Sequence, residues 1–155
     1  MPFTISSATF TDAEEIAVLL RRSIVELCQD DHGNDPEKYE PWLKNKTTEN
    51  VERWIVGPGR VFSAVDERRK VVGVVMGTPD GEVVLNYVSP DARFSGVSKM
   101  LMNAIEEYFR DRGLTSAVLN STCTAERFYR SVGYAETGRV ELHRELMCRQ
   151  FRKAL

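Results

Sequence analysis

The segment VSPDARFSGVSKML, residues 88–101, joins an apolar run to a helical pattern and contains residue types that bind phosphate. Gly96 and Ser98 fall in the first turn of the expected helix, where main-chain N–H groups lack partners and the helix dipole is positive. Small side chains let a ligand approach, and Arg93 adds a cation for a phosphate oxygen. The spacing predicts a phosphate or pyrophosphate site, although a cap at Ser95 and a turn at Gly96 explain the same residues without a ligand.

Several other chemistries lack their sequence patterns. The chain contains no G-x-x-x-x-G-K-[ST] and no G-x-G-x-x-G, so P-loop nucleotide hydrolysis and dinucleotide binding are not expected. The three cysteines, Cys28, Cys123 and Cys148, are odd in number and form no C-x-x-C pair. They predict neither a disulfide framework nor a metal site, and they are typical of thiols in a reducing compartment.

Charge and hydropathy restrict the partners. The formal net charge is −2 and no run of Lys or Arg forms a basic block, so we expect no nucleic acid and no anionic membrane as partner. No window approaches the about 20 apolar residues of a membrane span, and residues 1–16 lack the pattern of a signal peptide. A cytoplasmic protein is expected.

The periodicity of apolar residues predicts the elements that would position this segment. A capping box at Thr11 and Glu14 predicts the start of the first long helix, and Gly113 predicts the end of the helix that follows Gly96. That helix is expected to bury Val97, Met100, Leu101, Ala104, Ile105 and Tyr108, and to expose Lys99, Asn103, Glu106 and Arg110. Strands are expected at residues 4–7, 61–65, 71–76, 83–88, 116–120, 134–140 and 145–153, with short helices at 38–45, 49–55 and 124–132. A strand-helix-strand crossover flanked by antiparallel pairs predicts one α/β domain over residues 1–155.

Two segments together resemble a known family. Residues 87–113, YVSPDARFSGVSKMLMNAIEEYFRDRG, are similar to the acyl-CoA-binding core of the GCN5-related N-acetyltransferases (GNAT), with the V-x-P turn and the Arg-x-x-Gly-x-small pattern. Residues 125–134, AERFYRSVGY, resemble the A-x-x-F-Y-x-x-x-G-F segment of the same family and follow the expected strand. The resemblance implies a GNAT-like mixed, mostly antiparallel sheet of about seven strands with a central splay, flanked by helices.

The resemblance also implies where acetyl-CoA, the cosubstrate, would bind. It would lie between the strand ending at Val88 and the strand ending at Asn120, with the pyrophosphate on the amides of residues 94–99. Asn120 would hold the pantetheine amide, although a helix cap or turn residue explains it as well. The cofactor-binding set is Tyr87, Val88, Arg93, Phe94, Ser95, Gly96, Val97, Ser98, Lys99, Asn120 and Tyr129.

Tyr129 and Glu82 are the catalytic candidates. Tyr129 matches the family's Tyr that protonates the departing CoA thiolate, while aromatic packing beside Phe128 is the alternative. Where many members carry a glutamate base, this chain has Val84. Side-chain alternation would put Glu82, Val84 and Asn86 on one face, with Glu82 about 7 Å from the base position. Glu82 is then a base acting through water, or else a solvated residue beside a turn.

The remaining reactive residues receive simpler interpretations. Cys123 is expected to be a buried small residue, because direct acetyl transfer needs no thiol nucleophile. His32 is expected in an exposed loop and His143 in the turn between the last two strands. The loop is acidic, which favours a cationic amine or marks a solvated face; its acidic residues are Asp30, Asp31, Asp35, Glu37 and Glu40.

The expected function is therefore transfer of an acetyl group from acetyl-CoA to a primary amine, either a small amine or a lysyl or N-terminal amine, by direct attack. Val84 and Ser98, which depart from the family pattern, motivate an alternative of another class. In that alternative the chain is a non-catalytic acyl-CoA-binding sensor or interaction module. The C-terminal strands leave a sheet edge that can pair in a homodimer.

Overall fold

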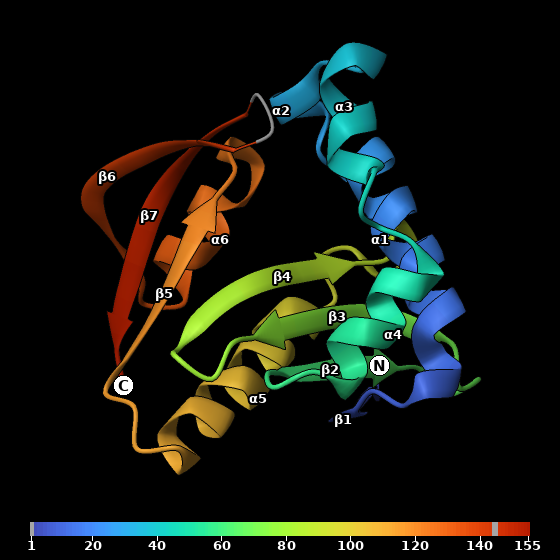
Figure 1. The fold of residues 1–155 in the computed structure, drawn as a ribbon, viewed down its shortest axis with the longest axis horizontal. Helices are drawn as coiled ribbons and strands as arrows, with labels where there is room; N and C mark the ends of the chain where they lie inside the picture. Colours follow the sequence, from blue (N-terminus) through green and yellow to red (C-terminus); the bar gives the residue numbers. More distant parts are fainter. Residues whose placement is uncertain (1, 144–145) are drawn as a thin grey trace.

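The fold is built on one seven-stranded sheet, described by a computed structural model that covers residues 2–143 and 146–155 (Figure 1). The strands are β1 (Thr4–Ser7), β2 (Arg60–Val65), β3 (Val71–Gly77), β4 (Glu82–Val88), β5 (Ser116–Ser121), β6 (Ala135–His143) and β7 (Leu146–Ala154). The helices are α1 (Ala13–Leu27), α2 (Gln29–His32), α3 (Pro36–Leu43), α4 (Thr48–Val56), α5 (Val97–Asp111) and α6 (Glu126–Ser131). Three 3₁₀ turns complete the described chain: η1 (Phe10–Asp12), η2 (Pro90–Ala92) and η3 (Cys123–Ala125).

The sheet divides into two halves at its centre. The strand order is β1-β2-β3-β4-β5-β7-β6, and β4 and β5 form the parallel pair of an otherwise antiparallel sheet. Their pairing covers two partner pairs, Glu82 with Val118 and Val83 with Leu119. Beyond these residues the strands diverge (Figure 1). The mixed sheet with a central splay is confirmed.

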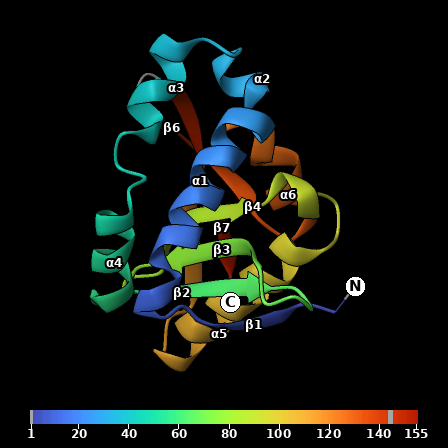
Figure 2. The ribbon, with the colours of Figure 1, turned by 90° about the vertical axis from the view of Figure 1, so that its right-hand side faces the viewer.

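Helices cover both faces of the sheet (Figure 2). Helix α1 packs with α4 over one face, where Ile16 and Leu20 meet β3 residues such as Val74. Helix α5 packs on the other face, where Leu101 and Ile105 join one core cluster with residues of α6, β5 and β7. The segment that is predicted to bind phosphate thus lies between β4 and α5.

Two glycines of β3 let α5 approach closely. A Cβ on Gly73 would lie 2.7 Å from Val97 Cγ1, and one on Gly77 would lie 2.8 Å from Ile105 Cδ1. Real Cβ atoms do not come so near other carbon atoms, because packed interiors are already close to the density of organic crystals. The glycines therefore set the distance between α5 and the sheet at both ends of the contact.

The buried face of α5 differs from the expected one. Met100 is exposed, whereas Glu106 is 2 % exposed, so both expectations were wrong. The buried face runs through Leu101, Ile105 and Phe109, one turn apart, and Glu106 lies at its edge. Glu106 tolerates burial because Tyr134 donates to its Oε2 at 2.9 Å and Lys153 Nζ to its Oε1 at 2.9 Å.

The start of α1 also differs from its prediction. The capping box joins Thr9 and Asp12 rather than Thr11 and Glu14, since the Thr9 N–H donates to Asp12 Oδ2 at 2.8 Å. A 3₁₀ turn at residues 10–12 precedes the α-helix, which moves the cap two residues toward the N-terminus. The residues of the expected pattern are present in both places, so the sequence alone did not decide between them.

The short helices expected after α1 are present as α3 and α4, but α2 at residues 29–32 forms where an exposed loop was expected. His32 is 0 % exposed; its Nε2 donates to the Ile24 carbonyl at 2.7 Å and its Nδ1 accepts from the Asn34 N–H at 3.0 Å. The expectation of an exposed His32 was wrong because both ring nitrogens are satisfied inside the fold. Cys123 is exposed, which also contradicts its expected burial. His143 was expected in the turn between the last two strands, but it is the last residue of β6 and pairs with Leu146 of β7, so that expectation was wrong; residues 144–145 lie outside the described residues.

Candidate functional site

A cavity of about 500 Å³ opens where β4 and β5 diverge. Its wall combines β4, the loop before α5, the end of β5, part of α1, η3 and the middle of α6. The expected acyl-CoA residues that line it are Tyr87, Val88, Arg93, Phe94, Ser95, Gly96, Val97, Ser98, Lys99, Asn120 and Tyr129. The structure brings the whole predicted set together around one space, and it leaves Glu82 outside that lining.

The N-terminus of α5 presents main-chain N–H groups at this cavity. The first main-chain hydrogen bond of the helix runs from the Met100 N–H to the Gly96 carbonyl at 3.2 Å. The N–H groups of residues 97–99 precede it and have no carbonyl within the helix. Gly96 is the N-cap residue at φ 86°, a conformation that favours glycine. Ser95 does not cap the helix, because its hydroxyl donates to the Ala92 carbonyl.

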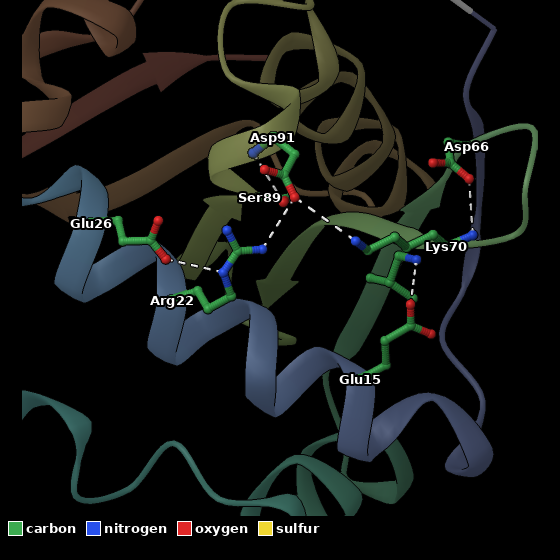
Figure 3. A network of polar contacts seen from close by, with 8 residues as sticks. Glu15, Arg22, Glu26, Asp66, Lys70, Ser89 and Asp91 are labelled. Atoms are coloured by element: carbon green, nitrogen blue, oxygen red, sulfur yellow. Dashed lines mark hydrogen bonds and ion pairs between the residues drawn. The ribbon is translucent and has the colours of Figure 1, made fainter.

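Ion pairs hold the turn that leads into this loop (Figure 3). Asp91 accepts from Arg22 Nη1 at 3.2 Å and lies 3.8 Å from Lys70 Nζ. The Asp91 N–H donates to Ser89 Oγ at 3.2 Å. The hydrogen bond from Arg22 holds the pKa of Asp91 below its usual range. Such exposed pairs add little stability, but these join α1, the β2–β3 turn and η2 at one carboxylate.

Tyr129 is a buried residue of α6 that lines this cavity. Its hydroxyl accepts from Asn86 Nδ2 at 3.5 Å, and its ring packs against those of Phe128 and Tyr134. Burial raises the pKa of Tyr129 to about 12, so the hydroxyl keeps its proton at neutral pH. Within the described part of the chain, Asn86 Oδ1 is a buried oxygen without a hydrogen-bond partner. Both side chains line the cavity, where an unsatisfied polar atom favours a ligand.

A second, smaller cavity adjoins the first on the side of α3. Its volume is about 180 Å³, and it shares Val84, Tyr87 and Asn120 with the first cavity. Glu82 lines it together with Trp42 and Lys46. The shared residues lie where β4 and β5 separate, so the two cavities adjoin at the opening in the sheet.

A β-bulge at Val84 decides which way Glu82 faces. Val83 pairs with Gly77 and Leu85 with Met76, so Val84 has no partner of its own. A bulge shifts side-chain alternation by one residue. Glu82 therefore lines the second cavity with Leu85, while Asn86 reaches Tyr129 on the opposite face. The expectation that Glu82 shares a face with Asn86 was therefore wrong, although Glu82 and Val84 both line the second cavity, and nothing in the residues around Val84 marked the bulge.

The second cavity also contains residues that the sequence reasoning missed. Trp42 Nε1 donates to the Tyr87 hydroxyl at 3.2 Å, and burial raises the pKa of Tyr87. Lys46 is buried, with Nζ donating to Asn45 Oδ1 at 2.6 Å and to the Trp42 carbonyl at 3.3 Å. A tryptophan in a polar, turn-rich segment was the available signal, because large aromatic side chains are rarely left fully in water.

The predicted acidic loop and Asn120 have specific partners. Asp31 accepts from the Thr124 hydroxyl and main-chain N–H, which ties α2 to η3. Asp35 caps α3 by accepting from the Glu37 N–H at 3.0 Å. Asn120 Nδ2 donates to Glu141 at 3.5 Å and lines both cavities. Asp31 and Asp35 therefore stabilise the fold through these hydrogen bonds. Asn120 does not cap a helix, because the N-cap residues of η3 and α6 are Thr122 and Ala125.

Two further findings concern the described residues alone. Across 2–143 and 146–155, no group of three or more His, Cys, Asp or Glu side chains gathers in a way that could hold a metal ion. In the same part of the chain, every helix is too short or too polar to span a bilayer.

Comparison with known proteins identifies the family. Residues 29–153 match the acetyltransferase (GNAT) domain, while a comparison with curated proteins finds no match. A GCN5-related N-acetyltransferase from Rhodopseudomonas palustris superposes with a TM-score of 0.88 at 21% identity, covering 100% of this chain and 97% of that chain. PaiA N-acetyltransferase from Thermoplasma acidophilum, solved in complex with coenzyme A, gives 0.80 at 16% identity and covers 100% of both chains. Aminoglycoside 6′-acetyltransferase type Ii gives 0.71 at 18% identity, covering 97% of this chain and 96% of that chain. With most of its length matched by this domain and the same fold throughout, the chain belongs to the GNAT acetyltransferase family.

Proposed function

We propose that the protein transfers an acetyl group from acetyl-CoA to a primary amine by direct attack. One observation carries the proposal: the cavity at the divergence of β4 and β5 has an open helix N-terminus at one side and the protonated Tyr129 hydroxyl at another. The first feature suits a pyrophosphate and the second suits a departing thiolate. Membership of an acetyltransferase family supports the same reaction.

The donor is bound mainly by main-chain groups. Beyond Val83, β4 no longer pairs with β5, so the main-chain groups of Val88, which face away from β3 in the alternating ladder, are available to the amides of the pantetheine arm, while the Tyr87 side chain lines the same cavity. Asn120, at the end of β5, holds the arm from the other side. The amides of residues 94–99 take the pyrophosphate, with Arg93 and Lys99 as cations. The thioester then lies at the opening between the two cavities.

Tyr129 acts as the general acid. The neutral amine attacks the thioester carbonyl carbon, so a C–N bond forms, the C–S bond breaks and the thiolate takes the Tyr129 proton. Asn86 Nδ2 donates to the Tyr129 oxygen, which leaves the hydroxyl proton free for another acceptor. The phenolate recovers its proton from solvent after product release.

Glu82 acts as the base through water, and the acceptor enters the second cavity. The attacking nitrogen must lose a proton, and among the described residues Glu82 contributes a carboxylate to the lining of this space. A volume of about 180 Å³ equals that of about six waters. A small amine or the end of a lysyl side chain fits such a space, and the remaining acidic residues of α2 and α3 favour a cationic acceptor.

The test is release of CoA thiol from acetyl-CoA in the presence of a panel of small amines, polyamines and lysyl or N-terminal peptides. We expect release that depends on one class of amine, with the acetylated amine identified by its mass. The bulge residue Val84, placed between the cavities without a carboxylate, favours the non-catalytic sensor as second candidate. Tight acetyl-CoA binding without release for any amine would select the sensor.

A further inference from the structure

Phe94 is held in an unfavourable state at the mouth of the large cavity. Its φ is 63°, in the left-handed region that a bulky side chain rarely adopts. The residue is 91 % exposed, so its apolar side chain gains almost nothing from burial in the chain itself. Both features cost free energy, and observed backbone strain at a binding site is a reason to look for a role of the residue in that site.

The surroundings of Phe94 fix its position. The preceding turn is closed by the hydrogen bond from the Ala92 N–H to the Ser89 carbonyl at 2.9 Å, and Ser95 returns its hydroxyl to the Ala92 carbonyl. The Arg93 guanidinium lies 4.6 Å from the centroid of the Phe94 ring. An aromatic ring and a cation are therefore placed together directly before the open amides of α5.

We infer that the Phe94 ring is a stacking platform for the purine base of the donor. This inference rests on the proposed function, because it takes the pyrophosphate of acetyl-CoA to lie on the amides that follow Phe94. The base is joined to that pyrophosphate through one ribose, which brings it to the same side of the loop. Purine faces stack readily on aromatic side chains, and Arg93 offers its charge to the nucleotide phosphates.

The test compares two donors and three variants. Dissociation constants are measured for acetyl-CoA and for acetyl-phosphopantetheine, which lacks the adenine nucleotide. Phe94→Asn removes the ring and tolerates the left-handed backbone, Phe94→Tyr keeps the ring, and Phe10→Asn removes another exposed phenylalanine, 56 % exposed on η1. The unfolding midpoint of each variant confirms that it folds.

We expect Phe94→Asn to weaken acetyl-CoA binding by about tenfold and to leave acetyl-phosphopantetheine binding unchanged. Phe94→Tyr and Phe10→Asn should bind both donors like the wild type. In NMR spectra, the adenine H2 and H8 signals of bound acetyl-CoA should move upfield in the wild type and lose that ring-current shift in Phe94→Asn.

Three outcomes would overturn the inference, and they separate it from the proposed function. Unchanged acetyl-CoA binding in Phe94→Asn, with turnover intact, removes the stacking role and leaves the acetyltransferase proposal standing. Unchanged donor binding with slower turnover of a peptide amine alone assigns the ring to a protein acceptor instead. Failure of the wild type to bind either donor removes both proposals together.

Discussion

The Tyr129 hydroxyl and Asn86 form a small polar pair inside an apolar wall. The hydroxyl accepts one hydrogen bond from Asn86, and Tyr129 packs within the core cluster formed by α5, β5 and β7. Because desolvation disfavours the phenolate, the pKa of Tyr129 rises to about 12. A hydroxyl with such a pKa does not ionise in the neutral range, so its proton is present when the thiolate departs.

Replacing Tyr129 with Phe should lower kcat by about a hundredfold, with little change in KM for acetyl-CoA, because the ring keeps its packing. The wild-type rate should show no alkaline fall from this residue until the pH approaches about 12, since the acid form persists below its pKa. Steady-state kinetics across pH measure both effects. An unaltered kcat in Tyr129→Phe would contradict the acid role.

Glu82 faces the second cavity, where its carboxylate can accept the amine proton through water. Glu82→Gln should therefore lower kcat/KM by about tenfold or more. Glu49→Gln, at an exposed position of α4, is the matched control and should leave kcat/KM unchanged. A Glu82→Gln variant with the kcat/KM of the wild type would eliminate this residue as the base.

Residues in the two motifs were more predictable than residues whose role depends on packing. Arg93 and Gly96 were chosen from the spacing of a phosphate site and Tyr129 from the family resemblance, and all three line the large cavity. The bulge at Val84 was not, because it depends on how β3 and β4 pair. The burial of His32 was missed for a related reason: its partners at Ile24 and Asn34 come from the folded segment and not from its composition.

At the scale of elements, the packing of α5 on β3 sets where the open amides lie. Gly73 faces Val97 in the first turn of the helix, and Gly77 faces Ile105 and Phe109 farther along. Close packing at Gly73 therefore positions the first turn of α5, which contains the open amides. Close packing at Gly77 positions the later part of the helix, which lies in the core.

This difference predicts a matched pair of variants. Gly73→Ala and Gly77→Ala should each lower the free energy of unfolding by about 1–3 kcal/mol, because each overpacks the interface. Gly73→Ala should also weaken acetyl-CoA binding, since it displaces the first turn of α5. Denaturant unfolding and ligand titration measure the two effects. Equal acetyl-CoA affinity in both variants would show that the position of this turn does not govern binding.

Glu106 links the two halves of the sheet behind the splay. It belongs to α5, which packs on β3, while its partners Tyr134 and Lys153 belong to the part of the chain that contains β6 and β7. The direct contact between the halves, through β4 and β5, is short. The buried carboxylate therefore adds a polar connection at the back of the cavity.

Removing this charge should destabilise the fold. Glu106→Gln leaves Lys153 without its counter-ion and should lower the free energy of unfolding by about 2 kcal/mol. The neighbouring Glu107→Gln loses an exposed pair with Arg110 and should change it by no more than about 0.5 kcal/mol. Urea denaturation compares the two variants. Equal stability would mean that the buried pair contributes no more than an exposed one.

In the molecule as a whole, the order of most elements could be predicted from the periodicity of apolar residues. The splayed sheet could be predicted because two motifs resemble a family whose members have such a sheet. The strands β1 to β5 appear where alternating and apolar runs placed them. The second cavity was not predictable, since it is lined by α3, β4 and β7 residues distant in sequence. The sheet ends at β6, and pairing of that edge in a homodimer stays a prediction.

The most direct test of the account is the shift in thermal unfolding on adding acetyl-CoA, with ATP and NAD as controls. A ligand at a hundred times its Kd stabilises the folded state by about 2.7 kcal/mol, which raises the midpoint by several degrees in a chain of this size. We predict such a shift with acetyl-CoA and none with the controls. No shift at millimolar acetyl-CoA would contradict the donor site, and the proposed function with it.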